Sequence, residues 1–325
     1  MQVGVIQGSE IGGLLFSLYI NDAPDDVKSQ AILYADDLKI ARAIRSCDDR
    51  SILQRDINAV LQWAGIWRMS LCIEKLAYLH IGQRFIDHTY MCDMHCIPVL
   101  ERVKDLGVMF TKNFKFRSHI DVVCKKANAL CALIYRSFEY RDTKFLASLF
   151  TTYVRPYVDY CCQVWSPHLL MDIKRVERIQ RAFTKRIPQL RQTEYCDRLR
   201  ILGLQSLEHR RHYLDLCFLY KIVHGMVNLS PCDIGIEPTM GSKLRTDGYA
   251  LRTVKPKSSL AMFSFACRSL RLWNALPLGA YRLSYNAFRH FVDKLNLVNL
   301  AHKGHTYSHK MLCLNMSCSL LLMNE

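Results

Sequence analysis

The spacing of apolar residues changes once along this chain, near residue 113. Before that point, residues 31–35 and 38–41 are short apolar runs typical of strands, residues 50–64 carry a helical stripe, and residues 76–81 again resemble a strand. After it, apolar residues recur at the three- and four-residue spacing of helices. We therefore expect an α+β fold, with a mixed first part followed by a mainly helical remainder.

The helical remainder follows a predicted hairpin at residues 103–110, which turns near Gly107 or Asn113. Ser118 is the expected N-cap of the first long helix. A second helix is expected to stop before Pro156, because the residue before a proline disfavours the helical conformation. The expected domains are residues 1–112, 113–227, a linker at 228–258 containing proline and glycine, a helical segment at 259–300 and a tail at 301–325.

Basic residues are concentrated in the second part of the chain. Residues 1–100 contain 9 Lys and Arg against 12 Asp and Glu, whereas residues 101–325 contain 35 against 17, a net charge of +18. Such an imbalance indicates a polyanionic partner, with nucleic acid as the first candidate and a merely solvated basic surface as the alternative. The strongest basic face lies on the helix predicted over 173–187 and consists of Lys174, Arg175, Arg178, Arg181, Lys185 and Arg186.

Composition excludes several other classes of protein. Aromatic residues make up 10% of the chain and charged residues 22%, which is enough to build a core and excludes a disordered or fibrous chain. The chain has 14 cysteines, but its first residues do not resemble the signal peptide of a small secreted, disulfide-rich protein. We therefore expect free thiols and an intracellular location, in the cytoplasm or nucleus. The apolar run at residues 11–20 is too short and interrupted to insert into a membrane.

Two adjacent carboxylates, Asp36 and Asp37, separate the first two predicted strands. A gap of this length is typical of a tight hairpin, so both should lie at its turn. Hard carboxylate oxygens are ligands for a divalent cation such as Mg²⁺, which serves phosphoryl transfer. The alternative is ordinary turn chemistry, since aspartate often bonds nearby backbone in turns.

Several further motifs occur along the chain on both sides of Asp36 and Asp37. The sequence VGVIQGS occupies residues 3–9, LLF residues 14–16, YIND residues 19–22 and YADD residues 34–37. Trp63, Trp67, Leu71 and Lys75 follow, and then KDLGV at residues 104–108. Together these motifs resemble the palm of reverse transcriptases from non-LTR retrotransposons.

The resemblance continues downstream. Residues 153–157 (YVRPY), 165–167 (WSP), 178–181 (RIQR), 202–204 (LGL) and 272–277 (LWNALP) are similar to the region after the polymerase in jockey- and CR1-like elements. The resemblance implies an RNA-directed DNA polymerase, with a partial palm made of a hairpin and helices followed by a helical thumb. It also implies an RNA template, a DNA primer, deoxynucleoside triphosphates and Mg²⁺ or Mn²⁺.

The resemblance also assigns roles to individual residues. Asp36 would be the catalytic metal ligand and Asp37 its neighbour in the metal site, with Lys75 near the triphosphate. The template and incoming nucleotide would meet Gln7, Gly8 and Ser9, and the primer end would be gripped by the hairpin of Leu106 and Gly107.

The chain departs from the family pattern at a few positions. Ile6 and Gly13 stand where the family has proline, and Ile73 or Glu74 where it has asparagine. The family's fingers, and a palm strand with a third carboxylate, come before these motifs. We therefore expect a truncated fragment that does not polymerise by itself. The alternative is an inactive or domesticated remnant that only binds nucleic acid.

Four aromatic residues leave a further question open. Tyr153, Tyr157, Tyr160 and Trp165 could stack on bases or pack in the core beside Pro156.

Overall fold

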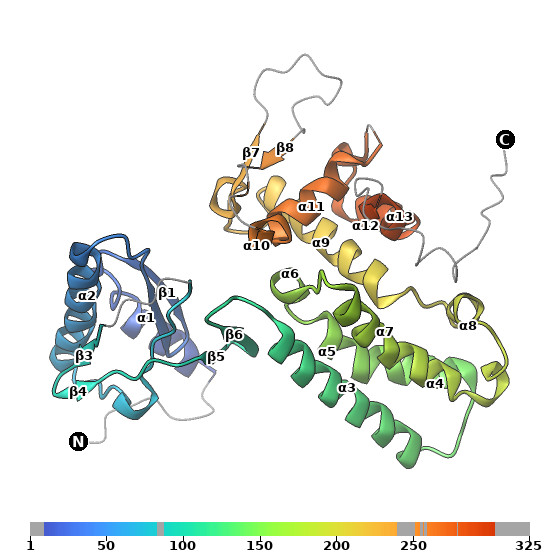
Figure 1. Ribbon diagram of the computed structural model, residues 1–325, viewed down its shortest axis with the longest axis horizontal. Coiled ribbons are helices and arrows are strands. Elements are labelled where there is room, and N and C mark those ends of the chain that lie inside the picture. The colour runs from blue at the N-terminus through green and yellow to red at the C-terminus, as the bar shows by residue number, and fades with distance from the viewer. Residues whose placement is uncertain are drawn as a thin grey trace. The chain divides into compact units, whose positions relative to one another are not determined.

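The computed structural model describes residues 10–82, 88–238, 251–253, 256, 259–277 and 279–302. Its contacts divide the chain into two units, the first made of residues 1–103 and 111–113 and the second of residues 104–110 and 114–325. Helices and small antiparallel hairpins alternate in the first unit, and helices dominate the second (Figure 1). The α+β prediction is confirmed, while the five-part division into domains stays a prediction.

The first unit is built around one long helix and a two-stranded hairpin. Its elements are α1 (Gly12–Ile20), β1 (Gln30–Tyr34), β2 (Asp37–Ala41), α2 (Cys47–Ile66), a 3₁₀ turn (Ile73–Lys75), β3 (Met91–Cys92) and β4 (His95–Cys96). The β1 and β2 strands pair antiparallel. On α2, Leu53, Ile57 and Leu61 pack against Tyr90, Cys92 and Ile97 to form the core of this unit.

The strand predicted at residues 76–81 is wrong. After the 3₁₀ turn, the described chain there forms an isolated parallel bridge between Tyr78 and Val99. The Tyr78 N–H donates to the Pro98 carbonyl, and Leu100 N–H donates to the Tyr78 carbonyl. Because Pro98 has no N–H of its own, it cannot extend the ladder.

The predicted hairpin near residues 103–110 is present as β5 (Arg102–Asp105) and β6 (Val108–Thr111). It turns at Leu106 and Gly107, whose φ angles are 42° and 87°. The second position therefore suits glycine, which adopts positive φ without a steric cost.

The second unit contains two helical layers with separate cores. The first layer comprises α3 (Arg117–Ser137), α4 (Thr143–Leu149), a π-helical segment (Phe150–Val154), α5 (Arg155–Asp159), α6 (Cys162–Trp165), α7 (Leu170–Lys185), a 3₁₀ turn (Pro188–Leu190) and α8 (Tyr195–Leu202). Leu146, Phe150, Trp165, Ile179 and Phe183 are buried in its core. These helices are coloured green to yellow-green in Figure 1.

Two predicted helix boundaries in this layer are wrong. Ser118 is not the N-cap, because α3 already begins at Arg117. The preceding residue, Phe116, packs against Phe110 and Phe114. The helix also does not stop before Pro156. A π-helical turn precedes the proline, with Arg155 N–H bonded to the Phe150 carbonyl. Pro156 then lies in the first turn of α5, where its missing N–H costs little.

The second layer packs around α9 (Leu207–Val223). Its other elements are a 3₁₀ turn (Cys232–Ile234), β7 (Ile236–Pro238), β8 (Leu251–Thr253), α10 (Ser259–Met262), α11 (Phe265–Asn274), a 3₁₀ turn (Ala280–Arg282), α12 (Tyr285–Asp293) and α13 (Leu297–His302). The predicted linker at 228–258 thus contains a strand pair, and the buried Ile236 and Leu251 belong to this core. Residues 303–325, most of the predicted tail, lie outside the described residues.

A buried ion pair in the second layer also bonds to the first layer. Arg268 of α11 donates from Nε to the fully buried Asp215 of α9 at 2.7 Å. The same guanidinium donates to the carbonyl oxygens of Cys162 and Gln163 in α6. Loss of Arg268 would remove both the ion pair from a buried site and the hydrogen bonds that connect α11 to α6, so this side chain helps to fix how the two layers pack.

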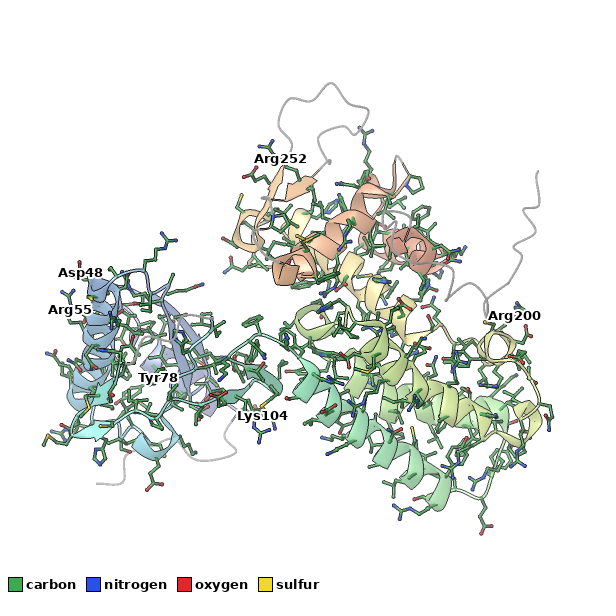
Figure 2. The ribbon with its side chains drawn as sticks, in the orientation of Figure 1. Asp48, Arg55, Tyr78, Lys104, Arg200 and Arg252 are labelled. Atoms are coloured by element: carbon green, nitrogen blue, oxygen red, sulfur yellow. The ribbon has the colours of Figure 1, made fainter. Side chains whose placement is uncertain are left out.

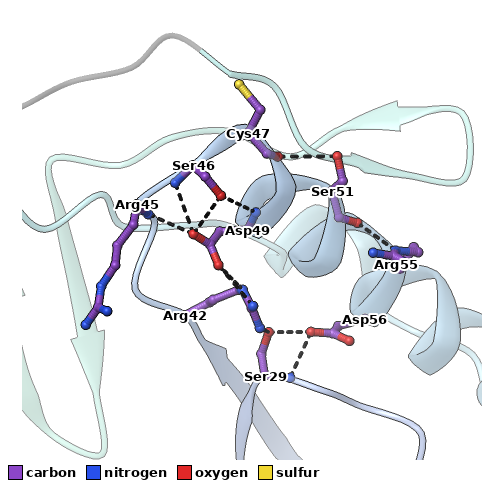
Figure 3. Close-up of polar contacts among 9 residues, drawn as sticks. All are labelled: Ser29, Arg42, Arg45, Ser46, Cys47, Asp49, Ser51, Arg55 and Asp56. Carbon is purple, nitrogen blue, oxygen red and sulfur yellow. Dashed lines mark hydrogen bonds and ion pairs between the residues drawn. The ribbon is translucent and has the colours of Figure 1, made fainter.

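The β1–β2 hairpin is fastened to α2 by a second buried carboxylate, Asp56, which is 2% exposed. It accepts a hydrogen bond from the backbone N–H of Lys28 at 2.9 Å. It also accepts hydrogen bonds from the backbone N–H of Ser29 at 3.0 Å and from the Ser29 hydroxyl (Figure 3). These bonds hold the chain immediately before β1 against the middle of α2.

The end of β2 is fastened to the start of the same helix. Arg42, which follows β2, donates from Nε to Asp49 of α2 at 3.1 Å. Asp49 also forms a capping box with Ser46 (Figure 3). Hydrogen bonds from the Arg45 N–H, from Arg42 and from Ser46 lower the pKa of Asp49 to about 2, so it is ionised at neutral pH.

Asp56→Asn tests the first of these attachments. The amide replaces an acceptor oxygen by a donor that faces donors, so at least one buried N–H loses its partner, at a cost of about 1–3 kcal/mol. We expect amide hydrogen exchange over residues 28–41 to become roughly 10- to 100-fold faster, as measured by mass spectrometry.

Asp48→Asn is the matched control, because Asp48 is exposed in the first turn of the same helix. It should leave exchange in the hairpin nearly unchanged. Equal exchange rates in the Asp56→Asn variant and the original chain would contradict the role assigned to Asp56.

Candidate active site

The two adjacent carboxylates lie at the tip of the β1–β2 hairpin, shifted by one residue from the prediction. Tyr34 pairs with Asp37, so Asp37 is the first residue of β2 and the turn consists of Ala35 and Asp36. Ala35 has a φ of 51°, the left-handed conformation that such a short turn requires. Both carboxylates are exposed to solvent.

Strand alternation determines which side chains accompany Asp37. Directly paired residues share a face, so Asp37 lies with Tyr34 on the face that also carries Ile32 and Lys39. Tyr34 is 62% exposed and Ile32 50%. The opposite, half-buried face carries Ala31, Leu33, Leu38 and Ile40. The hairpin therefore presents its carboxylates on an open surface while Asp56 and Asp49 hold its base.

Two neighbouring carboxylates can supply oxygen ligands to a divalent cation. Within the residues that the structure describes, no cluster of at least three His, Cys, Asp or Glu side chains could complete such a site. Asp36 and Asp37 thus fit part of a metal site, and further oxygen ligands would have to come from water, from substrate phosphates or from residues outside the described ranges.

No contact connects the other predicted catalytic and substrate-binding residues to the tip of this hairpin in the described part of the chain. Lys75 ends the 3₁₀ turn and is exposed, and in the described part of the chain no hydrogen bond or ion pair links it to Asp36 or Asp37. Gln7, Gly8 and Ser9 lie outside the described residues.

The second hairpin is fixed at its tip rather than at its base. Tyr160 Oη donates to the Leu106 carbonyl at 2.8 Å, and a Cβ added at Gly107 would lie 3.2 Å from Tyr160 Cε1. His119 of α3 accepts the Met109 N–H at its Nδ1, and Val108 is buried in the helical core. Leu106 and Gly107 therefore belong to a turn held rigidly by the helical layer.

Sequence reasoning missed the residues that position these two hairpins. Asp56 carried a detectable signal, because it lies on the apolar stripe of α2, three residues after Leu53 and one before Ile57. A carboxylate on such a stripe has to find buried donors. The hydrogen bond of Tyr160 to a turn far away in the sequence had no local signal.

The predicted basic face lies on α7, but its six cations are not equivalent. Arg175 forms an ion pair with Asp121 of α3, Arg181 lies 4.4 Å above the ring of Tyr195, and Arg186 lies 4.4 Å above the ring of Tyr135. Lys174, Arg178 and Lys185 are exposed and have no charged or aromatic partner within the described structure. These three, which we call the α7 stripe, are spaced so as to share the outer face of the helix.

In the described part of the chain, no helix combines the length and the apolar character needed to cross a membrane.

Comparisons with known proteins show which family this chain resembles. The model of the family described as reverse transcriptase (RNA-dependent DNA polymerase) matches residues 1–146. A probable RNA-directed DNA polymerase from the transposon X-element of Drosophila melanogaster is 28% identical over 188 residues, which cover 54% of this chain and 21% of that protein. An uncharacterized protein of Caenorhabditis elegans is 27% identical over 132 residues, 40% of this chain and 67% of that protein. No solved structure matches the chain significantly.

The region matched by the family model contains both hairpins, the anchoring helix α2 and the two tip carboxylates. The match to the transposon enzyme spans about a fifth of that protein's length. Residues 1–146 thus match the reverse transcriptase family, and the chain is similar to the RNA-directed DNA polymerase of a transposon.

Proposed function

We propose that this chain takes part in RNA-directed DNA synthesis, with Asp36 and Asp37 as metal ligands of the nucleotidyl-transfer site. The observation that carries the proposal is the pair of exposed carboxylates at the tip of an anchored hairpin, within the residues that match the reverse transcriptase family. An exposed tip leaves the carboxylate oxygens open to a cation and to substrate phosphates.

The proposed cation is Mg²⁺ or, in its place, Mn²⁺. When bound, it supplies positive charge that stabilises the oxygens of a phosphoryl group in transfer. The chain's own contribution is to hold two carboxylates in a fixed position, since the base of the hairpin is tied to α2 through Asp56 and Asp49. Lys75 is proposed to neutralise the triphosphate.

The proposed substrates are a DNA primer, an RNA template and deoxynucleoside triphosphates, as for the family. Gln7, Gly8 and Ser9 are proposed to line the template and nucleotide pocket. The turn of Leu106 and Gly107 is proposed to grip the primer end, and its fixation by Tyr160 and His119 supports a role that needs a rigid element.

Primer extension on an RNA template tests the catalytic proposal. It should be measured for this chain and for a version extended upstream in the same reading frame. Because two carboxylates provide only part of a metal clamp, we expect no incorporation by the chain alone and Mg²⁺-dependent incorporation by the extended version. Asp36→Asn should then lower incorporation by at least about 100-fold, whereas Asp48→Asn should change it less than about twofold.

Three results would change this account in different ways. Extension by the chain alone, abolished by Asp36→Asn, would mean that a further carboxylate of this chain completes the site. Extension that survives Asp36→Asn would refute the assigned metal ligand. Absence of extension by both versions would refute the catalytic proposal and leave the alternative, a remnant that only binds nucleic acid.

We also propose that the α7 stripe binds nucleic-acid phosphates. Lys174, Arg178 and Lys185 project from one outer face of α7, and Arg175 and Arg186 flank them toward α3. The second part of the chain, with its net charge of +18, adds a long-range attraction for polyanions.

The dependence of duplex binding on salt concentration tests this surface. If the whole face makes about five phosphate contacts, the slope of log affinity against log salt should be roughly −4 to −5. The triple variant Lys174→Gln, Arg178→Gln, Lys185→Gln should make that slope shallower by about 2–3.

A triple variant with the same loss of charge serves as the control. Lys112, Arg200 and Arg252 are exposed and each is engaged in a surface ion pair, with Glu101, Asp197 and Glu237 respectively. Arg200 and Arg252 are labelled in Figure 2. Their replacement by Gln should alter the slope by less than about 1. Equal effects of the two triple variants would show that net charge, and not the α7 stripe, determines binding.

A further inference from the structure

Three tyrosines of the second unit are exposed at the junction between the π-helical segment and α6. Tyr153 is 56% exposed, Tyr157 39% and Tyr160 54%. Trp165, which the sequence groups with them, is fully buried, and its indole N–H donates to the Tyr160 carbonyl at 2.7 Å. The structure thus separates one core aromatic residue from three that face solvent.

The π-helical turn and α5 place two of these rings on one side. Phe150, Val154 and Val158 are buried and recur every four residues, so they form the inner face of this stretch. Tyr153 and Tyr157 each precede one of these buried valines and are themselves four residues apart. Residues at this spacing are neighbours on a helix surface. The two tyrosines therefore occupy neighbouring exposed positions on one side of this stretch.

Positive charge accompanies these rings. The Lys126 ammonium of α3 lies 4.3 Å from the centroid of the Tyr157 ring, over one of its faces. Asp159, the carboxylate nearest to these tyrosines along α5, is bonded to Arg210 at 2.6 Å and is thereby neutralised. An aromatic surface with a cation beside it, in a part of the chain with a net charge of +18, complements a flexible polyanion that carries planar groups.

The third tyrosine connects this surface to the β5–β6 turn. Tyr160 donates its hydroxyl proton to the Leu106 carbonyl, and its ring closely approaches Gly107. A strand lying on Tyr153 and Tyr157 would thus run close to the turn proposed to grip the primer.

We propose that Tyr153, Tyr157 and Lys126 form a surface that binds single-stranded nucleic acid by stacking its bases. The two rings accept neighbouring bases, and Lys126 neutralises a phosphate of the same strand. This proposal rests on the proposed function and extends it. It adds a surface that contacts bases of any sequence to the α7 stripe, which contacts phosphates. The α7 stripe depends on charge alone, whereas this surface depends on the presence of bases.

A comparison of two strands of equal charge tests the proposal. The affinity of the full chain is measured by fluorescence anisotropy for a labelled oligothymidylate and for an abasic strand of the same length. Stacking on the two tyrosines should make the oligothymidylate bind at least about tenfold more tightly.

Two double variants identify the rings responsible. Tyr153→Leu with Tyr157→Leu keeps apolar side chains but removes the aromatic faces, and should reduce the affinity ratio to about one. Tyr153→Phe with Tyr157→Phe keeps the faces and should retain the ratio. Tyr140→Leu is the control, since Tyr140 is 67% exposed in the same unit but lies apart from this surface in the sequence.

Each remaining outcome has a definite meaning. Equal affinity of the original chain for both strands would overturn the stacking surface and leave the phosphate-binding proposal intact. A ratio that survives the double leucine variant would also overturn it, and would leave the tyrosines to another kind of partner such as a protein. Failure of both strands and of a duplex to bind would overturn both nucleic-acid proposals.

Discussion

The buried carboxylate of Asp56 is the interaction on which the position of the candidate active site depends. An isolated two-stranded hairpin is at best marginally stable in water, and β1–β2 pairs with no further strand in the described part of the chain. Asp56 compensates by binding the N–H groups before β1, while Asp49 holds Arg42 after β2. The helix α2 that provides both groups is in turn fixed by its capping box and by its packing against Tyr90 and Ile97.

The two hairpins in the region matched by the family are held in opposite ways. The β1–β2 hairpin is tied at its base, which leaves the carboxylates at its tip open to a cation and a substrate. The β5–β6 hairpin is tied at its tip by Tyr160, with His119 bonded to β6. This second arrangement suits an element that positions a strand, and the exposed tyrosines and the α7 stripe belong to the same helical unit.

Local sequence patterns predicted the elements that depend mainly on residues close together in the chain. The two hairpins, α2 and the long helices follow from apolar periodicity and turn residues, and the family resemblance follows from motifs that include Asp36 and Asp37. The errors arose where distant residues decide. Pro98 ends the ladder at Tyr78, and Ile236 and Leu251, which lie within the expected linker, pack into the core around α9. For the same reason, the anchoring of the hairpins by Asp56 and Tyr160 could not be derived from spacing. The error at Pro156, by contrast, is a local one, because a π-helical turn carries the chain through it.

Paramagnetic broadening by Mn²⁺ is the most direct test of the central claim, that the anchored hairpin presents a divalent-cation site. In nuclear magnetic resonance spectra of the chain, substoichiometric Mn²⁺ should selectively broaden the amide signals of residues 34–39. The effect should disappear in the variant with Asp36→Asn and Asp37→Asn and persist in Asp48→Asn. Broadening that is absent from the tip, or that is unchanged when both tip carboxylates are removed, would contradict the account.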